Sequence, residues 1–312
     1  MYKESEGMME ETTKKSGALK TFLTDIIRGM AIGVAFIIPG FSGGSIAAIL
    51  GIYEKLVGAI ADIFKSFKKS FFTLLPIGIG MVCGIIALLF PLGWALEAFP
   101  IPTVSLFVGL AIGGLPSITE RIKGKPNVNN LLALIIPLSL AAALSFLPTG
   151  ADVNLFELSL GGYALLFLIG LLGSSALVIP GISGSMILLI LGYYNPIVNL
   201  ATDHLLKGRD VGISIAVLGC TVAGIAIGFF LISIMMKLLL AKCPRGTYFA
   251  ILGFIVGSIP TVYVSTAKDA GLTFSTLPAS PLYWIAAVTL LLLGAAMSYS
   301  LVYFSRKKGI SE

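Results

Sequence analysis

Long uncharged apolar runs, separated by short polar segments, dominate the pattern of this chain. Several runs reach about 20 residues or more, the length that a helix needs to cross a hydrocarbon core of roughly 30 Å, and the surest of them are Phe71–Leu96, Val211–Met236 and Leu282–Ser305. A soluble protein would have to bury all three as core helices, which is improbable in one chain. The pattern therefore predicts an all-α polytopic membrane protein.

Composition agrees with lipid as the solvent. Hydrophobic residues make up 57% of the 312 residues and charged residues only 12%, against about 25% charged in soluble domains. Residues 1–20 mix acidic and basic side chains without the apolar stretch of a signal peptide, so we expect a disordered cytoplasmic tail there. The three cysteines are isolated and odd in number, which favours neither a disulfide framework nor a metal site. We expect no cofactor.

The chain contains an internal duplication. The sequence IPGFSGGS at Ile38–Ser45 returns as IPGISGSM at Ile179–Met186, and Pro39 and Pro180 lie 141 residues apart. An apolar stretch and a Gly-x-Tyr motif, ending at Tyr53 or Tyr194, follow each copy. A second pair of matching segments, Gly109–Pro116 and Gly253–Pro260, has an offset of 144 residues. Two matches at nearly one spacing indicate two related halves.

Each half predicts a helical hairpin, broken or re-entrant at the Pro-Gly turn, followed by three transmembrane helices. Proline and glycine break the helix, and such a break at membrane depth needs surrounding protein or water. A hairpin plus three spans leaves the next half on the opposite side, so we expect inverted-topology repeats. The predicted units are a cytoplasmic tail, repeat 1, an external linker, repeat 2 and a second cytoplasmic tail: 1–20, 21–147, 148–160, 161–305 and 306–312.

The basic residues predict the orientation. With a cytoplasmic N-terminus, 18 of the 21 Lys and Arg residues fall in inside segments, while the connections around Glu97 and from Asp152 to Glu157 hold none. Both termini are then cytoplasmic. The net charge of +6 reflects this asymmetry and does not indicate a nucleic-acid partner.

The two turns are the candidate substrate site. A serine occupies the N-cap position of the helix after each turn, free backbone N–H groups face the turn, and glycines allow close approach of an anion. The alternative is a pair of tight breaks whose small residues serve helix packing. Two related copies favour the ligand site, which comprises Pro39, Gly40, Ser42, Gly43, Gly44, Ser45, Pro180, Gly181, Ser183, Gly184 and Ser185.

Five further residues complete the candidate site. Arg28 lies roughly three helical turns before Ser42, where an unpaired arginine costs about 2.5–3.5 kcal/mol; it either binds the phosphate or snorkels to the interface. Glu54 either pairs with Arg28, carries a coupling proton or is a loop-edge charge, and Asn195 matches it in the second half. Tyr53 and Tyr194 either line the cavity or lie at the interface.

Four glycines show a spacing typical of helix packing. Gly109 and Gly113 are four residues apart, as are Gly253 and Gly257. Such small-xxx-small pairs let transmembrane helices approach closely. We predict that these glycines pack helices and do not bind substrate.

The paired Pro-Gly-[Phe/Ile]-Ser-Gly turns, each followed by Gly-x-Tyr, resemble the PopT-type polyprenyl-phosphate transporter family, bacterial membrane proteins long catalogued as a domain of unknown function. The resemblance covers nearly the whole chain after residue 21. It implies translocation of undecaprenyl phosphate from the outer to the cytoplasmic leaflet of the bacterial plasma membrane, for reuse in cell-wall synthesis. Ser185 and Met186 replace Gly44 and Ser45 in the second copy, so the halves need not bind equally.

Two other functions remain in view. The undecaprenyl pyrophosphate phosphatase family has a Pro-Gly-x-Ser-Arg-Ser turn, but here Gly43 and Gly184 stand in place of the arginine and no glutamate cluster is present. Phosphoryl chemistry needs concentrated positive charge or metal ligands, so we expect a transporter and not an enzyme. An ion-coupled transporter of small anions shares the broken-helix geometry. The sequence leaves open a coupling ion, either proton or sodium.

Overall fold

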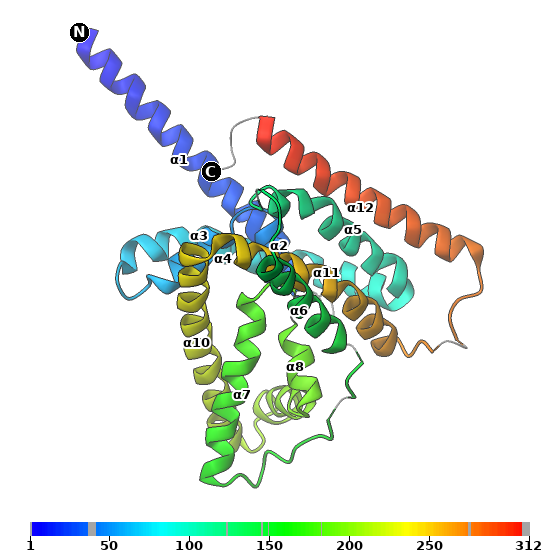
Figure 1. Cartoon of the computed structure of the whole chain (residues 1–312). Helices are drawn as coiled ribbons and strands as arrows, with labels where there is room; N and C mark the ends of the chain where they lie inside the picture. Colours follow the sequence, from blue (N-terminus) through cyan, green and yellow to red (C-terminus); the bar gives the residue numbers. More distant parts are fainter. Residues whose placement is uncertain are drawn as a thin grey trace.

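The computed structural model describes residues 2–36, 42–122, 124–144, 146–148, 150–181, 183–273 and 276–307. Within these ranges the regular structure is entirely helical (Figure 1). The first half contains α1 (Tyr2–Ala35), α2 (Gly43–Ile49), α3 (Tyr53–Ala61), α4 (Phe67–Ala98), α5 (Pro100–Thr119) and α6 (Val128–Leu144). The second contains α7 (Leu160–Val178), α8 (Gly184–Ile190), α9 (Tyr194–Asn199) with a π-helical turn (Leu200–Leu205), α10 (Val211–Lys242), α11 (Pro244–Asp269) and α12 (Pro281–Lys307).

The all-α membrane fold is confirmed. Within the described part of the chain, five helices are long and apolar enough to cross a bilayer, namely α4, α5, α10, α11 and α12. They include the three runs on which the prediction rests. The order of helices also recurs between the halves: α2 and α8 each have 7 residues, and α4 and α10 each have 32.

Two features differ from the expectation. Helix α1 already begins at Tyr2, inside the segment assigned to a disordered tail. The second difference is a short helix after each Gly-x-Tyr glycine, α3 or α9, which was not predicted from the sequence.

Some long helices pack in pairs within one half of the chain, and others pack in pairs that join the two halves. Within the halves α1 packs on α4, and α7 packs on α10 in the same way. The remaining pairs cross between halves, because α12 packs on α5 and α6 packs on α11 (Figure 1). Helices α5 and α11 also touch each other and are the most buried of the five candidate spans. Each half therefore depends on the other for its core.

Glycines determine how closely these pairs approach. A Cβ on Gly109 would lie 2.0 Å from the carbonyl oxygen of Leu291 on α12, and one on Gly253 would lie 2.2 Å from that of Leu134 on α6. Gly113 and Gly257 make equivalent approaches one turn later. The packing role predicted for the four glycines is confirmed, since any side chain would force the backbones apart.

Candidate functional site

The Gly-x-Tyr motif is the C-terminal stop of each short helix. Gly51 and Gly192 have φ values of 70° and 76°, in the left-handed region that glycine tolerates best. The backbone N–H of each glycine donates a hydrogen bond to the carbonyl oxygen three residues back, and the N–H of the next residue, Ile52 or Tyr193, donates to the carbonyl oxygen five residues back. This Schellman arrangement ends α2 and α8 after two turns. The tyrosine of each motif then begins α3 or α9.

The start of α2, which follows the first Pro-Gly motif, and the second Pro-Gly turn come together inside the protein. A Cβ on Gly44, in the first turn of α2, would lie 3.1 Å from the carbonyl oxygen of Val178 and 3.4 Å from the backbone nitrogen of Pro180. Gly181, with φ 86°, packs against the backbone of Phe254 on α11. The start of α2 in the first half is thus in contact with the turn of the second half.

Serines line these turns and are buried. Ser42 and Ser183 occupy the N-cap positions of α2 and α8 with extended backbone, as predicted, although neither side chain caps its helix. Ser45 is 2% exposed and its Oγ has no hydrogen-bond partner. A buried hydroxyl without a partner costs about 1–3 kcal/mol. Ser45 therefore offers an unused hydrogen-bonding group next to the meeting point of the turns.

Tyr53, at the start of α3, joins this region directly. Its side chain is buried, and its hydroxyl donates a hydrogen bond of 2.9 Å to the carbonyl oxygen of Val178. Of the two roles left open for Tyr53, the structure favours the interior one. The bond also fixes the start of α3 against the end of α7.

A buried carboxylate holds the two cations nearest to the first hairpin. Asp25 on α1, whose side chain is 3% exposed, forms ion pairs with Lys55 and, at 3.5 Å, with Arg28. Arg28 is thus a paired, mostly buried arginine, and one carboxylate is shared between two cations. The sequence analysis missed Asp25 and Lys55. The available signal was an acid three residues before Arg28 on the same helix face.

Of the three roles considered for Glu54, pairing with Arg28 is not seen in the structure. Glu54 instead accepts hydrogen bonds from Arg121, at 2.7 Å, and from the hydroxyl of Tyr248. The Arg121 guanidinium also lies over the Tyr248 ring, 5.5 Å from its centroid. Because α3 begins at Tyr53, Glu54 lies in its first turn, within reach of α11 and of the segment after α5. Glu54 therefore joins α3 to these neighbours, and Arg28 remains with Asp25.

The second half carries no equivalent charge cluster among the described residues. Tyr194 is half-buried, and Asn195 is exposed and donates a hydrogen bond of 3.3 Å to Asp152 in the linker. Of the other predicted residues, Gly43 and Gly184 begin α2 and α8. Pro39, Gly40 and the side chain of Ser185 lie outside the described part of the chain. The two halves are similar in backbone and different in charge.

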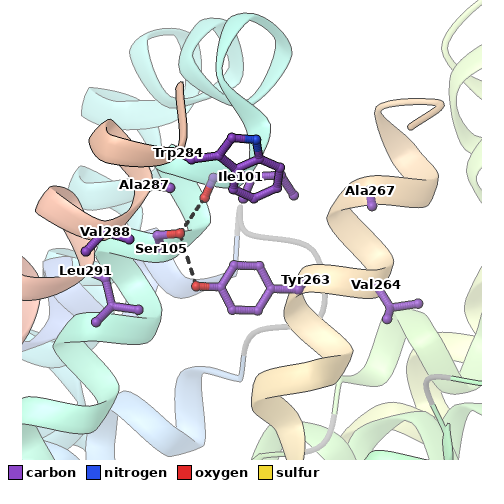
Figure 2. A pocket seen from close by; sticks show the side chains of 9 residues that line it. All are labelled: Ile101, Ser105, Tyr263, Val264, Ala267, Trp284, Ala287, Val288 and Leu291. Carbon is purple, nitrogen blue, oxygen red and sulfur yellow. Dashed lines mark hydrogen bonds between the residues drawn. The ribbon is translucent and has the colours of Figure 1, made fainter. Parts of the chain in front are cut away.

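Two apolar cavities border the central helices. One, of about 390 Å³, lies between α5, α11 and α12 and has a hydrogen-bonded pair of hydroxyls, Ser105 and Tyr263, on its wall (Figure 2). None of the residues lining it belongs to the turns. The other, of about 300 Å³, lies between α10 and α11 and includes Ile179, the residue before Pro180. Only the second cavity is continuous with the candidate site.

These features define a class of protein: a polytopic helical membrane protein in which the start of α2 meets the second Pro-Gly turn in the interior, with a buried carboxylate and its two cations near the first hairpin. The family described as VCA0040-like, undecaprenyl phosphate translocase-like, matches residues 32–276. The chain belongs to this family, and the resemblance inferred from the paired turns is confirmed.

Two characterised relatives extend the comparison. The polyprenyl-phosphate transporter of Vibrio cholerae serotype O1 is 26% identical over 326 aligned residues, covering 94% of this chain and 100% of the relative. The polyprenyl-phosphate transporter of Staphylococcus aureus is 29% identical, covering 89% of this chain and 95% of the relative. No solved structure matches the chain.

Proposed function

We propose that this protein is a polyprenyl-phosphate translocase that returns undecaprenyl phosphate from the outer to the cytoplasmic leaflet of a bacterial plasma membrane, for reuse in cell-wall synthesis. The contact between Gly44 and the Val178–Pro180 segment is the observation that carries the proposal. A phosphate held there meets groups from both halves at once. The family and the names of both relatives support a polyprenyl phosphate as substrate.

The turns supply neutral donors for a phosphate group. The first backbone N–H groups of α2 and α8 have no intrahelical acceptors, and the Ser45 hydroxyl has no protein partner. Glycine at position 44 leaves the backbone open to a close approach. Hydrogen bonds from such groups are strong when the acceptor is charged, as a phosphate oxygen is.

Arg28 and Lys55 supply charge near the same hairpin. They share the single carboxylate of Asp25, so the cluster carries one surplus positive charge. An arriving phosphate is able to replace Asp25 as a partner of either cation. With both termini cytoplasmic, this cluster lies on the cytoplasmic side, where it receives the head group after transfer.

The test is transport of a labelled polyprenyl phosphate between leaflets of liposomes containing the purified protein. We expect transfer that depends on the protein, and a parallel series with a proton or sodium gradient tests a coupling ion. In cells lacking redundant transporters, depletion should cause undecaprenyl phosphate to accumulate on the outer surface. Absence of both effects contradicts the proposal.

Two additional measurements separate the alternatives. Release of inorganic phosphate from the pyrophosphate lipid by the purified protein would identify a phosphatase. Flux of soluble anions through protein-containing liposomes without polyprenyl lipid would identify a small-anion transporter. We expect neither activity.

A further inference from the structure

We propose that the cavity between α10 and α11 binds the part of the polyprenyl chain nearest to the phosphate. We call this cavity the inner groove; Ile179, Met235, Met236, Leu239, Cys243 and Phe254 are among its lining residues. The inference rests on the proposed function and adds a site for the hydrocarbon part of the same substrate.

The position of the inner groove fits this role. It begins at Ile179, next to the Pro180 turn, and extends to Cys243 and Gly246, where α10 gives way to α11. In a polyprenyl phosphate the chain is bonded directly to the phosphate, so the first prenyl units must leave the head-group site through an adjoining apolar path. The inner groove adjoins the second turn. The cavity in Figure 2 does not.

The lining offers hydrocarbon and almost no free polar groups. Thr247 carries the one side-chain hydroxyl among the lining residues, and this hydroxyl already donates a hydrogen bond of 2.8 Å to the carbonyl oxygen of Cys243. An occupant therefore gains by burying apolar surface and not by hydrogen bonding. Its volume of about 300 Å³ lies at the lower end of the range of ligand pockets.

The walls are able to adapt to a branched chain and to admit it from the side. Met235 and Met236 have flexible side chains that fit irregular shapes. A Cβ on Gly246 would meet no atom within 4 Å, so this wall is open. Met235, Leu239 and Cys243 are exposed on the protein surface. A chain can thus enter from the surrounding bilayer without unfolding a helix.

Cys243 makes the proposal testable. The chain has three free cysteines, so the variant C83S/C220S retains Cys243 as its one thiol. We propose to measure the rate at which a maleimide alkylates Cys243 in proteoliposomes. Polyprenyl phosphate at about ten times its Kd should slow the reaction roughly tenfold, since about one site in eleven is then empty. Phosphatidic acid and the uncharged polyprenol should protect much less.

Equal protection by phosphatidic acid would mean that ordinary acyl chains fill the inner groove, which overturns the inference. Unchanged alkylation in protein that binds and transports polyprenyl phosphate overturns it too, while the proposed function stands. If the protein neither binds nor transports this lipid, the proposed function itself fails.

A filling substitution gives an independent measurement. Ala250 lines the inner groove, and Ala250→Phe should weaken binding of polyprenyl phosphate at least fivefold while the protein remains folded and monodisperse. The matched control is Ala267→Phe, which adds the same side-chain volume to the cavity in Figure 2. Equal affinity in both variants and in the parent would contradict the assignment.

Discussion

At the scale of single residues, a substitution of Ser45 allows its effect on substrate binding to be measured apart from its effect on folding. Its buried hydroxyl has no protein partner, so Ser45→Ala should leave thermal stability unchanged or raise it by up to about 1 kcal/mol, because an unsatisfied polar group is removed. If the hydroxyl binds phosphate, transport in liposomes should fall roughly tenfold, the loss of about 1.4 kcal/mol of hydrogen bonding to a charged group. Transport and thermal unfolding are measured on the same preparation.

Ser214 provides a matched control for this variant. It is also fully buried with an unpaired hydroxyl, but it lies near the start of α10, outside the candidate site. Ser214→Ala should change stability in the same way and leave transport intact. If both variants lose transport equally, the loss has no connection with the turns.

Asp25 is the residue on which two cations depend. Asp25→Asn leaves Arg28 and Lys55 close together without their carboxylate, and the loss of charge-assisted bonds should cost about 1–3 kcal/mol in thermal unfolding. Adding Lys55→Gln should restore part of this loss, because one of the two unpaired cations is also removed. A double variant as unstable as the sum of its single substitutions would show that the two side chains are not coupled.

The sequence predicted backbone features of the site better than its charges. The doubled turn, the serines at the N-cap positions and the glycine spacing all follow from local patterns that recur along the chain. The ion pairs do not, because Glu54 meets Tyr248, 194 residues away, and such a pairing depends on how the helices cross. Asp25, the partner of Arg28, was therefore not predicted, although the choice of Arg28 and Glu54 as charged residues of interest came from the sequence alone.

At the scale of helices, the crossing of α1 and α4 depends on glycine. A Cβ on Gly80 would lie 2.0 Å from the carbonyl oxygen of Ile26, so Gly80→Ala must push the helices apart. We expect a loss of at least about 3 kcal/mol in thermal unfolding. Gly78→Ala, on the same helix with no atom within 4 Å of its Cβ, should be tolerated. Similar losses in both variants would show that the loss at Gly80 does not come from close packing, and helix propensity could not explain it because alanine is the better helix former.

Some helices could not be predicted from the pattern of apolar residues. The long spans are visible because lipid requires continuous hydrocarbon along them. Helix α3 has only nine residues, with one charged pair in its first turn, and its contacts come from α10, α4 and the ends of other helices. Gly51, which ends the preceding helix, determines where α3 begins, and the contacts with neighbouring helices hold α3 in place. A hydropathy pattern reports neither.

At the scale of the whole molecule, charged side chains from segments assigned to the same side of the membrane contact one another. Arg121 contacts Glu54, Lys237 pairs with Asp62, and Arg245 donates a hydrogen bond of 2.8 Å to the carbonyl oxygen of Gly124. The hydrogen bond from Lys237 holds the pKa of Asp62 below its ordinary value. Asp62 thus remains charged at neutral pH, and the pair is lost only as the pH falls through that lowered value. These contacts join segments that the positive-inside rule assigns to the cytoplasm.

Segments assigned to the outside also contact one another. Asn195 bonds to Asp152, and the linker amide of Val153 donates to the carbonyl oxygen of Gly192 at 3.1 Å. The linker therefore lies along the end of the second hairpin, as it should if that hairpin opens outward. If the repeats are inverted as predicted, the two hairpin mouths lie on opposite faces of the membrane, which is what a carrier needs to receive a head group on one side and release it on the other.

Cysteine labelling in intact cells tests this arrangement. In a variant with Cys83, Cys220 and Cys243 replaced by serine, we introduce Lys125→Cys or Asp152→Cys, one at a time. A membrane-impermeant maleimide should label position 152 from outside and reach position 125 only after the membrane is permeabilised, because the first lies in the linker and the second between α5 and α6. Lys207→Cys, beyond the second hairpin, should behave like position 152. Labelling of positions 125 and 207 from the same face would remove the inversion, and with it the assignment of the two turns to opposite leaflets.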